Sequence, residues 1–287
     1  MLMIILILAI FGLCLGSFIN ALVWRLHEQS RLKKKNLLVK KDKAFLAKLS
    51  IVNGRSMCPS CKHELGVKDL VPVFSWLSLK GKCRYCHKSI SWQYPVVELT
   101  TVLLFIGSYI WWPVAIHGHQ ITLFILWLVL LVGFIALAVY DLKWFLLPSR
   151  IIYVLTPLAL LMALIRIING SGQAKAVLDE ALAVIIGGGI FYILFQVSKG
   201  KWIGGGDVRL GFLLGLIAGT PGRSLLLIFL ASIIGSLTSL PLLFTNKVKK
   251  NTLIPYGPFL IVAIIIVQLF GHFILHWYQN AFFVNGV

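Results

Sequence analysis

Long apolar stretches, separated by short polar segments, dominate the chain. About 20 consecutive apolar residues cross a bilayer as a helix, and eight stretches approach that length. They cover residues 1–24, 94–112, 121–140, 151–168, 178–197, 208–219, 224–244 and 258–278. The alternating pattern of a membrane β-barrel is absent, so helices are the remaining way to span. The pattern predicts an all-α polytopic membrane protein with about eight transmembrane helices.

Two of these stretches differ from a typical transmembrane helix, one in its length and one in its position. The stretch over 208–219 is the shortest, and Pro221 with Gly222 separates it from the next one. The first stretch has the position of a signal peptide, but its first basic residue, Arg25, follows the apolar run. Cleavable signals carry their basic residues in front. We therefore expect residues 1–24 to be retained as the first transmembrane helix.

The distribution of basic residues predicts the orientation in the membrane. The chain has 27 Lys and Arg against nine Asp and Glu, and its 13% of charged residues is too few for an ordinary soluble domain. With the N-terminus outside, 24 of the 27 basic residues fall in the segments predicted to be cytoplasmic, which are 25–93, 141–150, 198–209 and 245–257. The positive-inside rule favours this topology, with both termini outside.

The basic run over residues 31–48 lies just inside the first predicted helix. Its Lys and Arg residues are placed to attract anionic lipid headgroups, at about 1 kcal/mol for each residue near the surface. The run lacks the series of interleaved aromatic residues that would favour base stacking. We therefore expect lipid headgroups, and no nucleic acid, as its partner.

Four of the five cysteines form two pairs, Cys58-Pro-Ser-Cys61 and Cys83-Arg-Tyr-Cys86, with 21 residues between them. Two such pairs offer four thiolates that converge tetrahedrally on Zn²⁺. Disulfides are disfavoured in the reducing cytoplasm, which leaves four unligated thiols as the alternative. His63 and His87 flank the pairs and are the residues that could replace a cysteine as a zinc ligand. Four protein ligands close the coordination sphere, so this zinc would organise the insert without activating water.

Three acidic residues lie at membrane depth or at a membrane edge: Glu98, Asp141 and Asp207. An ionisable group there is costly and is a functional-site hypothesis by default. Asp141 follows the stretch over 121–140, and Asp207 ends Gly204-Gly205-Gly206-Asp207 where the stretch over 208–219 begins. The predicted topology brings these two aspartates to the same cytoplasmic edge.

Two adjacent carboxylates suit general acid–base hydrolysis. They share one proton, so that the ionised carboxylate deprotonates a water while the protonated one donates to the scissile carbonyl. Gly204 and Gly206 let a substrate strand approach the backbone closely. Two alternatives stay open: each Asp caps a helix N-terminus, or the pair forms the ion path of a proton-coupled transporter.

Further residues on the fifth and sixth stretches predict local structure. Gly211, Gly215 and Gly219 form a stripe of small residues that permits close contact with a neighbouring helix. Asp179 and Glu180 begin the fifth stretch, where we expect them to act as charges at a helix N-terminus.

Six motifs in order identify a family. They are Gly16-Ser17-Phe18-Ile19-Asn20 with Arg25-Leu26, Gly54-Arg55-Ser56 before Cys58, Gly81 before Cys83 with a following Tyr94-Pro95-Val96-Val97-Glu98, Asp141 with Leu147-Pro148, Gly204 to Asp207, and Ile254-Pro255-Tyr256-Gly257-Pro258. This series resembles the type IV prepilin peptidases, bifunctional aspartyl proteases and N-methyltransferases of the bacterial inner membrane.

The resemblance implies a reaction and roles. Such enzymes cleave the basic leader of prepilin-like proteins after a glycine at the cytoplasmic face, and then methylate the new N-terminal amine with S-adenosylmethionine. By motif position, Asp141 and Asp207 are the catalytic dyad, and the four paired cysteines are the zinc ligands. Gly81 and Glu98 belong to the methyltransferase half.

We therefore predict a first transmembrane helix over 1–24, a cytoplasmic zinc-binding insert associated with methylation over 25–93, and a seven-helix peptidase bundle over 94–287. The rival enzyme class is another GxGD intramembrane protease, which the cysteine insert and the opening motif disfavour. The alternative function that involves no proteolysis is a proton-coupled transporter. Which pilus, secretion or competence system the protein serves is left open.

Overall fold

The computed structural model describes residues 1–34, 45–46, 48–51, 54–170, 172–244 and 255–284, and these contain helices and no strand. Most of the basic run over 31–48 lies outside the described residues. By length and apolar composition, seven of the described helices qualify as membrane spans: Leu2–Lys33, Gln93–Ile110, His119–Trp144, Ser149–Asn169, Gln173–Ser198, Pro221–Leu240 and Gly257–Phe282. The prediction of an all-α polytopic membrane protein is confirmed.

The stretch predicted over 208–219 becomes α8 (Gly205–Ala218), a helix of 14 residues. At 1.5 Å per residue it is about 21 Å long, which is shorter than the roughly 30 Å of a hydrocarbon core. It ends at Gly219, whose φ of 72° breaks the helix. The helix predicted as the eighth crossing is therefore α8, which is shorter than the seven helices that qualify as spans by length and composition.

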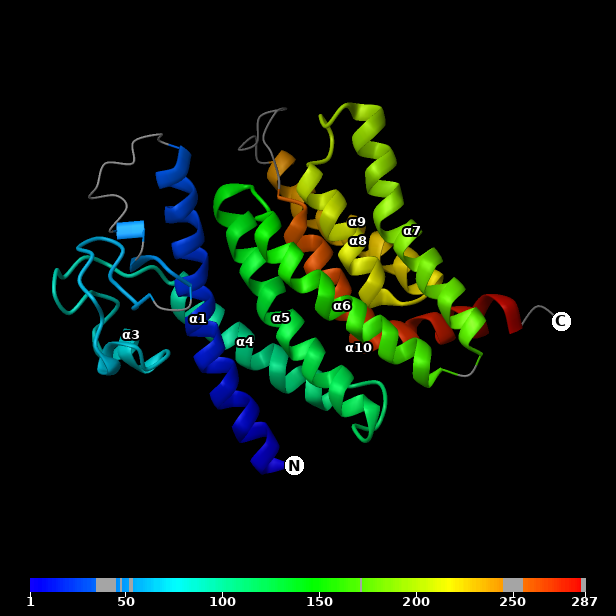
Figure 1. Ribbon diagram of the computed structural model, residues 1–287, viewed down its shortest axis with the longest axis horizontal. Helices are drawn as coiled ribbons and strands as arrows, with labels where there is room; N and C mark the ends of the chain where they lie inside the picture. Colours follow the sequence, from blue (N-terminus) through cyan, green and yellow to red (C-terminus); the bar gives the residue numbers. More distant parts are fainter. Residues whose placement is uncertain (35–44, 47, 52–53, 171, 245–254, 285–287) are drawn as a thin grey trace. The chain divides into compact units, whose positions relative to one another are not determined.

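The chain forms two compact units, Met1–Ile110 and Trp111–Val287. In the first unit, α1 (Leu2–Lys34) packs against α4 (Gln93–Ile110), and the intervening insert carries the short helices η1 (Val67–Asp69) and α3 (Phe74–Ser78) (Figure 1). Gly16 permits the close contact, because a Cβ added there would lie 2.6 Å from the Cα of Glu98. The functional division at residues 24 and 93 stays a prediction.

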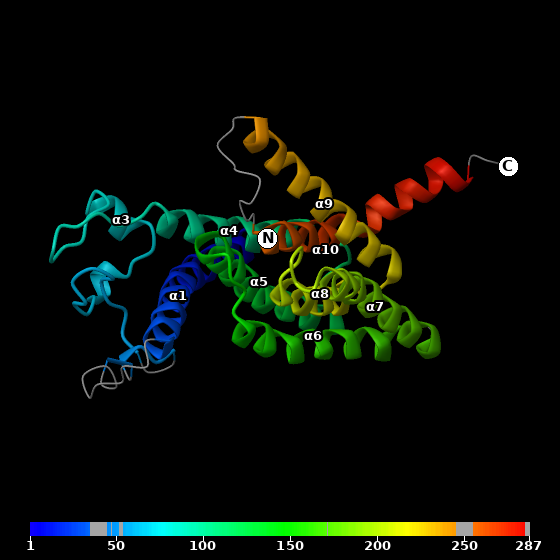
Figure 2. The same cartoon turned by 90° about the horizontal axis from the view of Figure 1, so that it is seen from above.

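The second unit is a helical bundle with α8 inside it. Its other helices are α5 (His119–Trp144), α6 (Ser149–Asn169), α7 (Gln173–Ser198), α9 (Pro221–Phe244), α10 (Gly257–Gln279) and the terminal π-turn η2 (Asn280–Val284). Helices α6, α7, α9 and α10 all pack against α8 (Figure 2).

The predicted small-residue contact lies between α7 and α8. A Cβ added to Gly215 would lie 2.7 Å from the carbonyl oxygen of Ala183, and one added to Gly211 would lie 2.6 Å from that of Gly187. Close helix contact is thus confirmed for Gly211 and Gly215. Gly219 has a different role, since it ends α8.

The prediction that Asp179 and Glu180 are charges at a helix N-terminus is wrong. Helix α7 begins at Gln173, about two turns before Glu180, so this carboxylate does not lie at the helix N-terminus. It is buried, with 7% exposure, and forms an ion pair with Arg166 of α6 at 2.5 Å. The apolar pattern placed the helix start too late, because Gln173, Lys175 and Asp179 interrupt it.

Candidate active site and metal centre

Asp141 and Asp207, 66 positions apart in sequence, line one cleft of about 610 Å³ in the second unit. Asp141 comes from the last turn of α5 and Asp207 from the first turn of α8. The fold therefore brings together the two acids that the sequence analysis singled out.

The carboxylate of Asp141 lies at the start of a third helix. Its side chain is 5% exposed, and the backbone N–H of Gly257, the first residue of α10, donates a hydrogen bond to it. The N-terminal end of a helix carries partial positive charge, which stabilises an ionised carboxylate. Beyond Asp141, α5 ends at Phe145, whose φ is 54° and whose N–H donates to the Asp141 carbonyl at 2.8 Å.

Asp207 is the third residue of α8 and accepts a hydrogen bond from the N–H of Gly204 at 3.2 Å. This contact satisfies a free amide of the helix N-terminus, so Asp207 caps its own helix while it also faces the cleft. Its side chain is half-buried, which leaves it accessible to water and substrate.

Leu147 packs against both backbone segments that support the acids. A Cβ added to Gly206 would lie 2.9 Å from Cβ of Leu147, and one added to Gly257 would lie 3.1 Å from its Cδ2. The Leu147-Pro148 motif and the two glycine motifs are therefore parts of one packing arrangement. Gly206 and Gly257 therefore have no room for a side chain, and a larger residue at either position would overpack the site, which protein interiors tolerate poorly.

The walls of the cleft are mostly apolar. The lining side chains include Leu146, Ile190, Phe191, Leu194, Trp202 and Ile203. Two hydroxyl groups join them, those of Ser232 and Tyr256, with their oxygens 3.5 Å apart. A cleft with two carboxylates and apolar walls fits an apolar peptide segment and supplies the groups for its general acid–base hydrolysis.

The four paired cysteines converge in the first unit. The Sγ atoms of Cys58, Cys61, Cys83 and Cys86 all lie within 4.8 Å of one another, and those of Cys58 and Cys86 are 3.9 Å apart. Thiolates on a tetrahedral zinc at about 2.3 Å are about 3.8 Å apart. The residues present therefore fit a zinc ion, which when bound would link the two cysteine pairs.

Both cysteine pairs have the same local structure. The N–H of Cys58 donates to the carbonyl of His63, and the N–H of Cys83 donates to that of Lys88, each at 2.9 Å. The residue after the second cysteine has a positive φ in each pair, 63° at Lys62 and 56° at His87. Two such turns aim their cysteines at a common point, as zinc knuckles do.

Histidine is not part of this cluster among the described residues. The Nδ1 atom of His63 lies 2.7 Å from the carbonyl oxygen of Glu64, and its ring stacks on Tyr85.

The thiol of Cys83 has a lowered pKa. Although burial opposes the shift, backbone hydrogen bonds from Cys86 and Tyr85 lower the pKa of Cys83 to about 7. A thiol with a lowered pKa supplies the thiolate that a metal binds.

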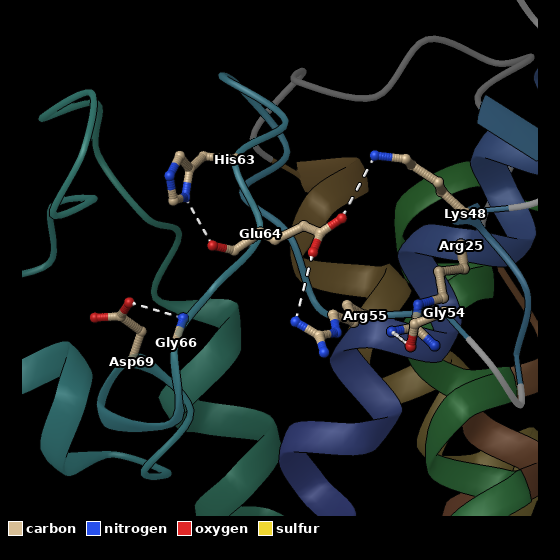
Figure 3. Close-up of polar contacts among 8 residues, drawn as sticks. All are labelled: Arg25, Lys48, Gly54, Arg55, His63, Glu64, Gly66 and Asp69. Atoms are coloured by element: carbon tan, nitrogen blue, oxygen red, sulfur yellow. Dashed lines mark hydrogen bonds and ion pairs between the residues drawn. The ribbon is translucent and has the colours of Figure 1, made fainter. Parts of the chain in front are cut away.

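Polar contacts hold the insert to α1 and to itself (Figure 3). Arg25 of α1 donates to the carbonyl of Gly54 at 3.0 Å, and the carboxylate of Glu64 pairs with Lys48 and Arg55. The amide of Gly66 donates to Asp69 at 3.2 Å. Arg25 is only 5% exposed. In the sequence, Arg25 has the position of a topology signal, and no local pattern indicates that its side chain is buried.

Gly81 and Glu98 also belong to the first unit. Gly81 has a φ of 69°, and a Cβ there would lie 2.9 Å from Cζ2 of Trp76, so both conformation and space require glycine. The buried carboxylate of Glu98 on α4 accepts a hydrogen bond from the N–H of Val73 at 2.7 Å. The two aspartates lie in the second unit, so the predicted methyltransferase and peptidase residues fall in different units.

Comparison with known proteins gives the family. The bacterial peptidase A24 N-terminal domain matches residues 10–112, and the type IV leader peptidase family matches residues 128–240. A prepilin leader peptidase/N-methyltransferase of Stutzerimonas stutzeri is 30% identical over 91% of this chain and 89% of its own length. Enzymes of the same name from Bacillus subtilis and Pseudomonas aeruginosa are 29% and 30% identical, over 95% and 93% of this chain and 96% and 90% of their own lengths.

No solved structure is significantly similar to the chain. The two family matches follow each other along the sequence, and the second contains both Asp141 and Asp207. The relatives match along nearly their whole length. With its seven apolar helices, this multi-pass membrane protein belongs to the type IV leader peptidase family.

Proposed function

We propose that this protein is a membrane aspartyl endopeptidase that cleaves the leader of prepilin-like proteins and then N-methylates the new N-terminus. The relatives from three bacteria carry both activities in their name, prepilin leader peptidase/N-methyltransferase. The proposed peptidase activity is supported above all by one observation, which is that Asp141 and Asp207 line the same cleft of the second unit.

The cleft geometry supports a two-carboxylate mechanism. One aspartate in its ionised form takes a proton from a water molecule, which attacks the scissile carbonyl carbon. The other aspartate, protonated, donates to the carbonyl oxygen, and the proton then passes to the leaving amine. The exposed Gly204 and the half-buried Gly206 border Asp207, where an extended substrate strand would lie.

We infer the orientation of the protein in the membrane from the distribution of its basic residues. Asp141 and Asp207 lie within the segments 141–150 and 198–209, which we assign to the cytoplasm together with the insert. With α8 as a short eighth crossing, both termini lie outside. The bacterial inner membrane is the expected location. A prepilin has a basic leader followed by an apolar helix, so its cleavage site would reach the cleft at the cytoplasmic edge, after a glycine. The apolar walls of the cleft support this choice of substrate.

The methyltransferase half is assigned to the first unit, where Gly81 and Glu98 lie. S-adenosylmethionine supplies the methyl group of the reaction that the relatives' name describes. We assign Zn²⁺ to the four cysteines as a structural ion, since four protein ligands leave no open position for a water. Anionic headgroups are the proposed partner of the basic run, and no role for nucleic acid is proposed.

A cleavage assay tests the peptidase half. The full chain in lipid nanodiscs would receive a prepilin-like substrate, with wild type compared with Asp141→Asn and Asp207→Asn. Both variants should lose cleavage by at least a thousandfold, because each neutral isostere keeps the size and removes the proton chemistry. Asp179→Asn, a change of the same chemistry on α7 and away from the cleft, should cleave normally.

Methylation of a pre-cut pilin peptide reports whether the inactive variants are folded. Both aspartate variants should still methylate this peptide. Full cleavage by either variant would remove the dyad from the mechanism. A wild type that cleaves no leader while an aspartate variant alters ion flux would favour the transporter.

A further inference from the structure

The cysteine insert exposes an apolar face next to the start of α4. Val71, Phe74 and Leu77 are 44%, 67% and 57% exposed, and they form what we call the apolar face of α3. Residues three apart share one side of a helix, and helical hydrogen bonds already begin at Val71. Trp76, on the other side of α3, lines a small cavity against α1 and α4. The apolar face points away from that cavity and is exposed among the residues that the structure describes.

A hydrogen bond fixes the position of α3 along α4. The backbone N–H of Val73, the residue before α3, donates to a carboxyl oxygen of Glu98 at 2.7 Å. Glu98 is five residues after Gln93, the first residue of α4, which corresponds to about 7.5 Å along the helix. The start of α3 therefore lies beside the first turns of α4 and not beyond its end.

Helix α4 needs its whole length to cross a membrane. Its 18 residues extend over about 27 Å, close to the roughly 30 Å of a hydrocarbon core. An element beside its first turns consequently lies at the boundary between headgroups and acyl chains. Figure 1 agrees with this depth, because in that view α3 is level with the middle of α1 and not with its C-terminal end.

Two contacts of Trp76 hold α3 at the same level. Its ring centroid is 4.2 Å from that of Trp92, which directly precedes α4 and is 69% exposed. Its indole N–H donates to the carbonyl of Ile90 at 3.2 Å. Tryptophan is enriched where membrane and water meet, so Trp92 is placed as an interfacial residue. The depth of α3 thus rests on Trp92 as well as on Glu98.

The backbone at the start of α3 is suited to surroundings with little water. Val73 has a φ of 61°, a conformation that β-branched residues rarely adopt. Its N–H would lack a partner in an apolar environment, where each unsatisfied backbone group is costly. The carboxyl group of Glu98 supplies that partner. The buried acid of α4 therefore has a positioning role, which is to hold the insert at this depth.

Lysines follow the apolar face along the chain. Lys80, Lys82 and Lys88 are exposed, and none of them forms an ion pair among the described residues. Arg84 differs, because it pairs with Asp69 at 2.7 Å. A short apolar face with Phe and Leu, bordered by free Lys residues, is typical of segments that lie in a membrane interface. The lysines add attraction to anionic headgroups.

We propose that the apolar face of α3 inserts among the acyl chains of the adjacent leaflet, with Lys80 and Lys82 at the phosphates of anionic phospholipids. In the proposed topology this is the cytoplasmic leaflet. The segment enters and leaves the membrane on one side, unlike the seven spans. The proposal concerns a lipid-binding surface of the insert and does not depend on the reaction that the protein catalyses.

Photo-cross-linking of the full chain tests the proposal. The photoreactive residue p-benzoylphenylalanine would replace Phe74 or Leu77 in separate preparations, in nanodiscs with equal parts of phosphatidylcholine and phosphatidylglycerol. Mass spectrometry after irradiation identifies the molecule attached to the probe. Both positions should give phospholipid adducts. Adducts with peptides of this protein in place of lipid would overturn the proposal.

Tyr85 is the matched control position, because it is also an exposed aromatic residue of the insert. Its ring stacks on His63, and the neighbouring Lys62 pairs with Glu28, which follows the apolar part of α1. The probe at position 85 should therefore lie in water and give about tenfold less lipid adduct than the probe at position 74. Equal yields at the two positions would contradict the proposed depth.

The charge of the bound lipid tests the part given to the lysines. Phosphatidylglycerol should exceed phosphatidylcholine among the adducts by about threefold, and Lys80→Gln with Lys82→Gln should remove the excess. Equal labelling of the two lipids by the chain with both lysines would refute that part.

A further measurement needs no substitution in the protein. Wild type would be irradiated in nanodiscs whose phospholipids carry a diazirine in the acyl chain, and the labelled peptides would be mapped. Label on residues 71–79 would support the proposal. Label on the transmembrane helices but not on this segment would overturn it.

Discussion

The buried ion pair between Arg166 and Glu180 anchors the end of α8 opposite to Asp207. Arg166 donates to Glu180 Oε1 from Nε at 3.0 Å and from Nη2 at 2.5 Å. It also donates to the carbonyl of Ile217 at 2.9 Å and to that of Leu216, in the last turn of α8. These carbonyls have no partner within their own helix. One guanidinium therefore pairs with Oε1 of a buried acid and with a helix C-terminus, whereas Oε2 of Glu180 is buried without a hydrogen-bond partner among the described residues.

Arg166→Met should destabilise the second unit strongly. The side chain of Glu180 is 9% exposed and that of Arg166 23% exposed, so little water would replace the lost partner. Breaking a buried pair by removing one member costs about 3–5 kcal/mol. For a unit of this size each kcal/mol lowers Tm by about 2–4 °C, and we expect a decrease of about 10 °C.

Thermal unfolding in detergent, followed by tryptophan fluorescence, measures the effect. Lys175→Met is the control, because Lys175 is exposed near the start of α7 and its loss should change stability by less than about 0.5 kcal/mol. The double variant Arg166→Met/Glu180→Leu is the sharper comparison. Replacing both charges with apolar groups removes the orphaned carboxylate, so the double variant should be more stable than Arg166→Met alone. If it is less stable, the reasoning from the buried charge is wrong.

Three further outcomes follow from the close contacts and the cysteine cluster. Gly206→Ala, whose new Cβ would lie 2.9 Å from Leu147, should lower the stability of the second unit by about 1–3 kcal/mol, whereas Gly205→Ala has 3.8 Å of room and should lower Tm much less. Wild type should bind one zinc per chain by elemental analysis, and Cys61→Ser should bind less than half as much, since three thiolates remain. Gly16→Ala, whose new Cβ would lie 2.6 Å from the Cα of Glu98, should force α1 away from α4 and lower the stability of the first unit by about 1–3 kcal/mol at unchanged zinc content; an unchanged Tm would contradict the role given to this contact.

The sequence predicted those features that depend on local spacing. Apolar runs of about 20 residues predicted the long helices, and the two CxxC pairs predicted a four-thiol cluster, because each pair is a single turn. The approach of α7 to α8 followed from a repeat of glycines four residues apart. In each case the signal lies within one helix or one turn, so neighbours in sequence are enough to interpret it.

Features that depend on tertiary contact were not predictable in this way. The partner of Asp141 is the amide of Gly257, more than 100 residues away, and nothing near Asp141 in sequence indicates it. Glu180 pairs with Arg166 of another helix, whereas its position suggested a helix-end charge. Arg25 follows an apolar run as a topology signal would, yet its side chain is buried. A charge pattern alone does not distinguish these roles.

The division of chemistry between the units predicts an order of events. The proposed cleavage groups belong to the second unit, and the residues assigned to methylation, Gly81 and Glu98, belong to the first. Methylation requires a free N-terminal amine, which exists only after the leader has been removed. Loss of Asp207 should therefore block methylation of a full-length prepilin but not of a pre-cut peptide. Loss of Glu98 should instead let cleaved, unmethylated pilin accumulate. Two separate sites are needed to give both results, blocked methylation in one variant and accumulation of cleaved pilin in the other. The two variants together therefore test whether the units act one after the other on the same substrate.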